Sequence, residues 1–360
     1  MISICESTSL PDSQSYHSNG GFVWWYLDLR DKEGNGLVLI WAFGLPFLPH
    51  YASQARKGNG RKPIDRPSLN ISIYTKGSLD FYLLQEYAPE DCDSTVHQWR
   101  FGRSHIRFEQ VFQKGILSVE LNCPIPNTRD CLTGTIHFEG PLRHGTIGQS
   151  DPTHQWTPII VAAEGEAHLS CGHSQYHIQG RGYHDRNAGT QPLHALDIDT
   201  WWWGRLAFPR HELIFYALFP KSTAPPLYLA IQVDSQGQTS RLTNPQVTFS
   251  AYRRSLYGMR WAQNISIEAD QTSTIEIQLK HKIEDGPFYQ RFMCDAHDAD
   301  GDSFGFVEQI IPDKVDLDWM RPFVKMRVHH LEHPNSIWLP LFTGPRQDRI
   351  RRLFHWGDHK

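Results

Sequence analysis

Residues 22–43 read FVWWYLDLRDKEGNGLVLIWAF. Two runs of aromatic and branched side chains, Phe22–Leu29 and Gly36–Phe43, flank the polar segment Glu33-Gly34-Asn35-Gly36. Such runs are typical of β-strands, and a segment rich in Gly and Asn is typical of a turn. This stretch therefore predicts two strands joined by a turn, and the same pattern recurs along most of the chain.

The recurring pattern predicts an all-β protein. Further strands are expected at Leu69–Tyr74, Leu79–Tyr87, Ser104–Gln113, Ile116–Leu121, Thr133–Glu139, Glu212–Phe219, Leu227–Val233, Val247–Ala251, Thr274–Lys282, Phe304–Gln309 and Val324–Val328. A chain of 360 residues exceeds what one core usually fills, so we expect two β-barrel or sandwich domains in tandem. The Gly-rich stretch 180–193 (GRGYHDRNAGTQPL) is the expected seam, which divides the chain into 1–190 and 191–360.

The composition excludes several classes of protein. A net charge of −4 argues against a nucleic-acid partner, and no apolar run is long enough for a membrane-spanning helix. Six Cys without CxxC spacing and a polar start without a signal-peptide core favour a cytoplasmic location. Metal and nucleotide motifs are not found, and Asp298–Asp302 is interpreted as an acidic hairpin turn because the flanking positions lack calcium ligands.

Two short clusters carry chemistry. His154-Gln155-Trp156 and Tyr183-His184-Asp185 each place a proton-transfer group two residues from an aromatic ring. Residues i and i+2 of a strand share a face, so each pair can form one wall of a pocket. A neutral Asp185 facing electron-rich rings suits protonation of an alkene, whose carbocation the rings of Trp156 and Tyr183 can stabilise. The simpler interpretation is a turn Asp beside core aromatic residues.

Other residues are candidates for substrate binding. Trp201-Trp202-Trp203-Gly204-Arg205 and the first strand are rich in Trp, and Asn187 lies two residues beyond Asp185. We name Trp202, Arg205, Asn187 and Trp25 as the candidate substrate-binding set. Structural roles, as aromatic anchors of core strands, are at least as well supported by the pattern.

These segments resemble the carotenoid 1,2-hydratase family, also called hydroxyneurosporene synthases, and its lipocalin-like relatives. The resemblance covers most of the chain, from the early WWYLD of residues 24–28 to WMRPFVKMRVH of residues 319–329. Its most specific parts are HQWTPI at 154–159 and GYHDRNAG at 182–189. The family's H-x-W and Y-x-D pairs fall on His154, Trp156, Tyr183 and Asp185.

The resemblance implies two lipocalin-like domains and cofactor-free hydration of the terminal C1=C2 double bond of an acyclic carotene. In that reaction Asp185 donates the proton and His154 or ionised Asp185 takes one from water. The YHDxN form also occurs in fungal pericyclases, so a cyclase of a polyene and a lipid-binding protein without catalysis stay as alternatives.

A carotenoid substrate is very apolar and resides in membranes. Peripheral contact with the inner membrane is therefore an alternative to a purely cytoplasmic location. The C-terminal tail mixes Arg346, Arg349, Arg351 and Arg352 with Leu353, Phe354 and Trp356, which suits an anionic surface. The sequence does not determine the oligomeric state.

Overall fold

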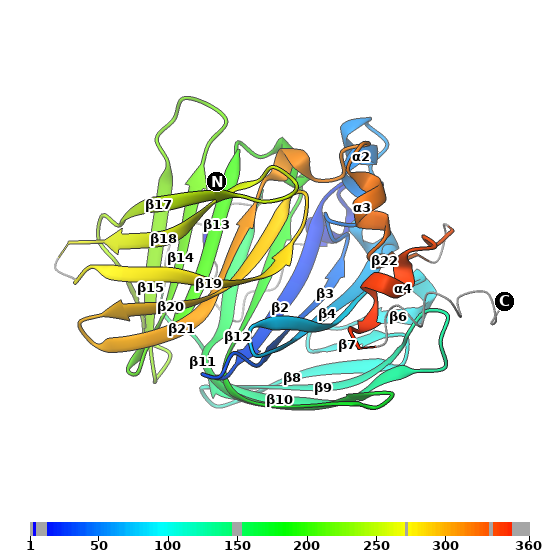
Figure 1. Ribbon diagram of the computed structural model, residues 1–360, viewed down its shortest axis with the longest axis horizontal. Helices are drawn as coiled ribbons and strands as arrows, with labels where there is room; N and C mark the ends of the chain where they lie inside the picture. The colour runs from blue at the N-terminus through cyan, green and yellow to red at the C-terminus, as the bar shows by residue number, and fades with distance from the viewer. Residues whose placement is uncertain (1–2, 5–12, 146–152, 271–272, 331–333, 348–360) are drawn as a thin grey trace.

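The computed structural model describes residues 3–4, 13–145, 153–270, 273–330 and 334–347, and nearly all of its regular structure is β (Figure 1). The strands of the first half are β1 (Ser3–Ile4), β2 (Phe22–Arg30), β3 (Gly36–Phe43), β4 (Pro67–Thr75), β5 (Ser78–Glu86), β6 (Cys92–Ser94), β7 (Gln98–Phe101), β8 (Ser104–Val111), β9 (Lys114–Pro124), β10 (Cys131–Pro141), β11 (Gln155–Cys171) and β12 (Ser174–Gly189). Those of the second half are β13 (Thr200–Ala207), β14 (His211–Phe219), β15 (Leu227–Asp234), β16 (Thr239–Arg241), β17 (Gln246–Arg254), β18 (Arg260–Glu268), β19 (Ile275–Asp285), β20 (Tyr289–Asp298), β21 (Gly301–Ile310), β22 (Val328–His329) and β23 (Gly344–Pro345).

The helices are short. They are α1 (Ser13–His17), α2 (Tyr51–Arg56), α3 (Arg321–Lys325) and α4 (Leu339–Phe342), with single 3₁₀ turns at Pro63–Asp65, Pro89–Asp91, Leu193–Ala195 and Pro312–Lys314. Among the described residues, no helix is long and apolar enough to cross a bilayer.

The strands form two curled antiparallel sheets. The first has the order β22-β5-β4-β3-β2-β12-β11-β10-β9-β8-β7-β6, with β1 beside β11 and β23 beside β5. The second has the order β16-β15-β14-β13-β21-β20-β19-β18-β17. This confirms the all-β, lipocalin-like expectation, and the hairpin of residues 22–43 is present, with Gly34 supplying the positive φ that its turn requires.

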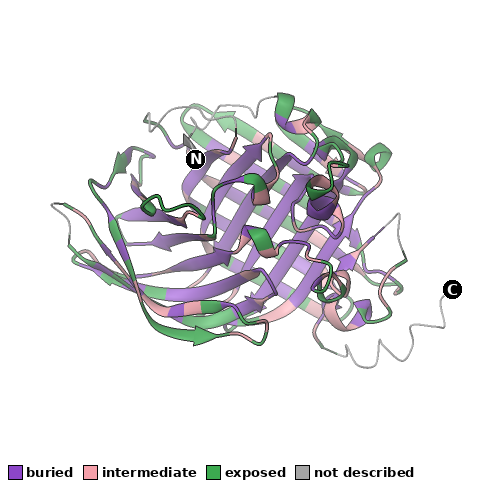
Figure 2. Ribbon diagram, turned by 90° about the horizontal axis from the view of Figure 1, so that it is seen from above, coloured by how far each residue is buried: buried purple, intermediate pink, exposed green. Residues whose placement is uncertain are grey.

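Three apolar cores follow from strand alternation. Every residue of β2 is buried: Trp25 and Leu27 point into the first curled sheet, whereas Trp24 and Tyr26 point toward the second sheet. A third core fills the second curled sheet. In Figure 2 the central strands are accordingly buried, while the loops and outer edges are exposed. The core between the sheets is where side chains from both halves of the chain meet.

The expected seam at 180–193 was wrong for residues 180–189. Residues up to Gly189 continue β12, which pairs with β2 on one side and β11 on the other, and the connection to the second sheet begins only at Thr190. The glycines that suggested a loop serve close packing: a Cβ on Gly182 would lie 2.0 Å from the Phe138 ring, and one on Gly180 would lie 2.2 Å from the Arg30 carbonyl oxygen.

The C-terminal segment also differs from expectation. Residues 324–328, predicted as a strand, form the end of α3 and the start of the two-residue β22, because Pro322 opens a helical turn. β22 and β23 pair with β5 of the first sheet, although their residues were assigned to the second domain. The predicted boundary at 190/191 therefore does not separate the C-terminal segment from the first sheet, because β22 and β23 belong to that sheet. The basic tail from Asp348 onward lies outside the described residues.

Candidate active site

A buried hydrogen-bonded cluster occupies the face of β12 that looks toward the second sheet. Tyr183, Asp185 and Asn187 alternate along this strand and therefore share one face. Trp156 stands on the neighbouring β11, opposite Asn187 in the register, and His154 directly precedes that strand. All five side chains are buried, so the two sequence clusters do come together.

Asp185 is the acceptor at the centre of this cluster. Its Oδ2 accepts hydrogen bonds from the indole N–H of Trp156 at 2.8 Å and from the hydroxyl of Tyr183 at 2.6 Å. The Trp156 N–H also approaches the Tyr183 oxygen at 3.1 Å. Two donors therefore fix Oδ2, which leaves Oδ1 as the oxygen better able to carry a proton.

The second oxygen is held through an amide. Asn187 Nδ2 donates to Asp185 Oδ1 at 3.2 Å, and Asn187 Oδ1 lies 3.0 Å from His154 Nε2. With the amide in this orientation, His154 donates from Nε2 and fixes the direction of the Asn187 side chain. His154 thus acts on Asp185 through Asn187 rather than by touching it.

Burial dominates the electrostatics of this carboxyl. Desolvation raises the pKa of Asp185 to about 7, although the hydrogen bonds from Tyr183 and Trp156 oppose the rise. The negative charges of Glu308 and Asp28 raise it further. A substantial share of Asp185 is therefore protonated near neutral pH, which an exposed Asp would not be.

The cavity in front of Asp185 is walled by aromatic rings. Asp185 and Asn187 share this cavity, of about 330 Å³ including the open space at its mouth, with Trp24 and Tyr26 of β2, Trp201 and Trp203 of β13, Tyr216 of β14, and Glu308 and Ile310 of β21. The rings contact one another, as in Tyr26 against Trp203 at 5.3 Å between centroids. An acid that faces this cavity can protonate an alkene at a place where the faces of aromatic rings stabilise the resulting carbocation.

The sequence analysis located the rings imperfectly. Trp156 and Tyr183 do not line the cavity but lie behind Asp185 as hydrogen-bond donors, with Trp156 packed edge-on against Tyr216 at 4.7 Å. Trp24, Tyr26, Trp201, Trp203 and Tyr216 provide the walls instead. Their alternation in the WWY and WWW runs was a usable signal, whereas Tyr216 and Glu308 lie in strands without a motif.

Two candidate substrate-binding residues point away from the cavity. Trp25 stacks with Trp41 inside the first curled sheet, at 6.1 Å between ring centroids. Trp202 packs against Phe249 inside the second, at 5.0 Å. Each is one residue out of phase with the cavity-lining Trp24, Trp201 and Trp203, because successive side chains of a strand face opposite ways.

A third candidate, Arg205, serves a buried ion-pair network. It faces the same side as Trp201 and Trp203 but contacts Asp28 at 3.2 Å and Glu212 at 3.1 Å, and it does not line the cavity. Arg181 also pairs with Glu212, so this network joins β2 and β12 of the first sheet to β13 and β14 of the second. Among the four candidates, only Asn187 reaches the cavity.

Within the described part of the chain, one group of metal-binding residue types occurs elsewhere. Glu166, His168 and His177 project from the outer part of β11 and β12, with ligand atoms within 4.8 Å of one another. His168 Nε2 lies 2.6 Å from Glu166 Oε1. These residues are largely exposed and line neither the aromatic cavity nor the larger one described below.

Two curled antiparallel sheets with a buried carboxylic acid between them make this a β protein of lipocalin-like fold. The chain belongs to the carotenoid hydratase CrtC family, whose model matches residues 39–334, and it is accordingly a hydro-lyase. The family resemblance stated from the motifs is confirmed.

Among characterised sequences, the chain is 26% identical to a hydroxyneurosporene dehydrogenase of Chlorobaculum tepidum, over 94% of this chain and 96% of that protein. It is 25% identical to an acyclic carotenoid 1,2-hydratase of Thiocapsa roseopersicina, over 77% of this chain and 65% of that protein. The first of these names denotes a dehydrogenase and the second a hydratase.

Solved structures share the fold at low identity. A putative AttH from Nitrosomonas europaea superposes with a TM-score of 0.60 at 12% identity, over 84% of this chain and 97% of that one. Kievitone hydratase from Nectria haematococca superposes with a TM-score of 0.53 at 11% identity, over 84% of this chain and 93% of that one.

Proposed function

We propose that this hydratase adds water to the terminal C1=C2 double bond of an acyclic carotene, with Asp185 as the acid. The O–H bond of the protonated carboxyl breaks as its proton bonds to C2 of the alkene. The π electrons form the new C–H bond and leave a tertiary cation at C1, flanked by the rings of Trp24, Trp201 and Trp203.

Water completes the reaction. Its oxygen bonds to C1, and the resulting oxonium group returns one proton to ionised Asp185, so the acid is regenerated and the net change is addition of one water. The hydrogen bonds from Tyr183 and Trp156 stabilise the carboxylate between the two steps. Asn187 and His154 are positioning residues that hold the second carboxyl oxygen toward the cavity.

The observation that carries this proposal is the state of Asp185. Burial raises its pKa to about 7, and it faces a cavity whose walls are mostly aromatic. A binding protein has no need of a neutral acid at such a position, and a pericyclase has no strict need of a proton donor. The membership of a carotenoid hydratase family supports the choice of substrate class.

The test is incubation of the purified protein with lycopene or neurosporene in H₂¹⁸O, and separately in D₂O. We expect a product with one ¹⁸O at C1 and one deuterium at C2. A product with the mass of the substrate would instead identify a cyclase, and recovery of unchanged but bound carotene would identify a binding protein. Either result would contradict the proposal.

A further inference from the structure

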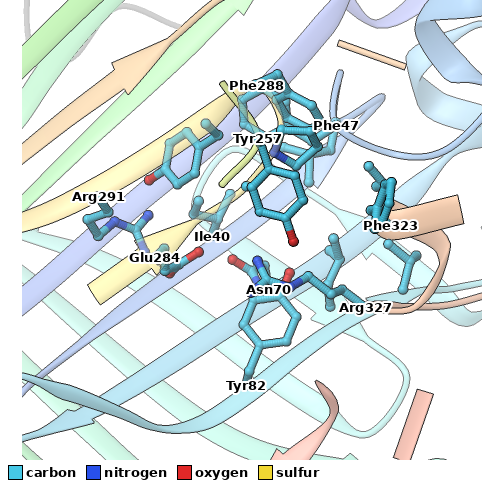
Figure 3. Close-up of a pocket in the computed structure, with 17 residues that line it drawn as sticks. Ile40, Phe47, Asn70, Tyr82, Tyr257, Glu284, Phe288, Arg291, Phe323 and Arg327 are labelled. Carbon is cyan, nitrogen blue, oxygen red and sulfur yellow. Dashed lines mark hydrogen bonds and ion pairs between the residues drawn. The ribbon is translucent and has the colours of Figure 1, made fainter. Parts of the chain in front are cut away.

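A second, larger cavity lies beside the aromatic one, at a junction of three parts of the chain (Figure 3). Its volume is about 690 Å³, counted together with the open space at its mouth. In Figure 3, Phe47, Tyr257 and Phe288 stand on one side, Tyr82 and Asn70 on another, and Phe323 and Arg327 of the C-terminal segment on a third. Its walls are mainly apolar, as suits an apolar guest.

The two cavities share a wall of side chains. Arg291 lines the larger cavity and donates from Nε to Glu308 Oε1 at 2.8 Å, and Glu308 lines the cavity of Asp185. The guanidinium carbon of Arg291 also lies 5.9 Å from the ring centroid of Tyr26, another residue of the smaller cavity. The Arg291–Glu308 pair thus stands between the two cavities, and a substrate that moves from the larger cavity to Asp185 has to pass this pair.

Tyr257 and Phe323 line the larger cavity, and the nearby Leu256 and Trp319 are exposed; we define these four residues as the rim. Tyr257 lies in the turn between β17 and β18, and its ring meets that of Phe323 on α3 at 5.7 Å. Leu256 is 98% exposed, Trp319 66% and Phe323 43%. Trp319 lies in the turn directly before α3, four residues ahead of Phe323.

Basic residues surround this rim. The segments 252–260 (YRRSLYGMR) and 319–327 (WMRPFVKMR) carry six Arg and Lys and no Asp or Glu, whereas the whole chain has a net charge of −4. Arg321 pairs with the neighbouring Asp316 and Asp318, but Arg253, Arg254 and Arg260 are exposed. The apolar rim is thus flanked by basic residues, although the whole chain carries a net negative charge.

We propose that the rim docks on an anionic lipid bilayer and that the larger cavity is the entrance through which an apolar substrate passes toward Asp185. Exposed aromatic and aliphatic side chains among Arg and Lys are the chemistry of an interfacial anchor. The entrance rests on the proposed function, since only an apolar substrate has to be collected from lipid. Docking itself is measured without turnover.

The test compares the double variant Leu256→Asp/Trp319→Asp with Phe112→Asp. Neither Leu256 nor Trp319 lines either of these two cavities, and Phe112 is a matched control because it is 93% exposed at the turn between β8 and β9. Flotation with vesicles of phosphatidylcholine, with or without phosphatidylglycerol, measures binding. We expect the wild type and Phe112→Asp to float with the anionic vesicles and the double variant to bind them at least ten-fold more weakly.

Activity on lycopene then tests the proposal that the substrate enters through the larger cavity. The double variant should lose most turnover of lycopene embedded in anionic vesicles and keep turnover of detergent-solubilised lycopene. Equal flotation of all three proteins, flotation of none, or equal loss with both forms of lycopene would overturn the inference. If the wild type fails to hydrate even solubilised lycopene, the proposed function fails, while flotation still decides the docking.

Discussion

Asp185 is the residue on which the proposed chemistry depends, and Asp185→Asn tests it. The amide is nearly isosteric but carries no acidic proton, so turnover should fall by the 10²–10⁴-fold typical of a lost general acid. Hydration of lycopene by the purified variant measures the effect. Turnover within a few-fold of the wild type would show that another group is the acid.

The same variant should be more stable than the wild type, by an amount that depends on pH. The folded pKa of Asp185, about 7, lies above its ordinary 3.8, so the unfolded chain releases this proton first as pH rises. Stability is therefore lost between about pH 4 and 7, by up to about 4 kcal/mol for a shift of this size. Urea unfolding at pH 5 and 8 should show the advantage of Asp185→Asn growing with pH; an unchanged difference would contradict the burial argument.

Activity should follow protonation of this acid. Since the pKa of Asp185 is raised to about 7, turnover of the wild type should fall as pH rises through that value. The pH dependence of kcat/KM for solubilised lycopene, with the far-ultraviolet circular dichroism as a control for folding, provides the measurement. Constant activity from pH 6 to 9 would be inconsistent with Asp185 as donor.

Trp156→Phe tests the hydrogen bond from Trp156 separately from its packing, because the variant keeps an aromatic ring but loses the N–H donor. The Trp156 N–H donates to Asp185 at 2.8 Å and thereby lowers the pKa of that carboxyl, so its loss should move the alkaline limb of the activity profile about one unit upward. Trp25→Phe is the matched control, because Trp25 is also buried but lies on the opposite face of the first sheet from Trp156. An unshifted limb in Trp156→Phe would assign Trp156 to packing alone.

For single residues, the sequence predicted which residues cluster better than it predicted which way their side chains point. The i, i+2 pairs correctly brought His154, Trp156, Tyr183 and Asp185 into one cluster. Which rings face the cavity depends on the phase of each strand relative to the second sheet, and a short motif does not contain that phase. Trp25 and Trp202 were consequently chosen one residue away from Trp24, Trp201 and Trp203.

Among the elements, β12 decides the geometry because it carries Tyr183, Asp185 and Asn187 on one face. Its glycines let neighbours approach: the ring of Phe138 fills the space where a Cβ of Gly182 would stand. Gly182→Ala should therefore cost about 1–3 kcal/mol of unfolding free energy and lower activity. Urea titration measures this.

Gly58→Ala is the control for that substitution. A Cβ on Gly58 would meet no atom within 4 Å, so only its positive φ of 76° opposes the change, at about 1 kcal/mol. Equal losses in the two variants would show that the Phe138 contact does not constrain β12.

Many strands were predictable from sequence, since alternation and turn residues mark β2 to β5, β8 to β10, β14, β15, β17, β19 and β21, whereas β11, β13, β18 and β20 were not predicted. The continuity of β12 was not, because glycines that permit close packing look like glycines that make a loop. The helical turn of α3 was missed for a related reason, since a few apolar residues do not distinguish one helical turn from a strand.

At the scale of the whole molecule, the site exists because two sheets face each other. Glu308 and Tyr216 come from the second sheet, Asp185 and Trp24 from the first, and only their packing encloses the cavity. The return of the C-terminal segment to β5 adds Phe323 and Arg327 to the larger cavity. Composition predicted two β units, but it contains no information on how their faces meet.

The central claim is that Asp185 holds a proton in the folded protein near neutral pH. Difference infrared spectroscopy between the wild type and Asp185→Asn, recorded from pH 5 to 9, tests it most directly. The account predicts a protonated carboxyl C=O band that belongs to Asp185 and disappears with a midpoint near pH 7. A spectrum showing only ionised carboxylate for Asp185 already at pH 5 would contradict it.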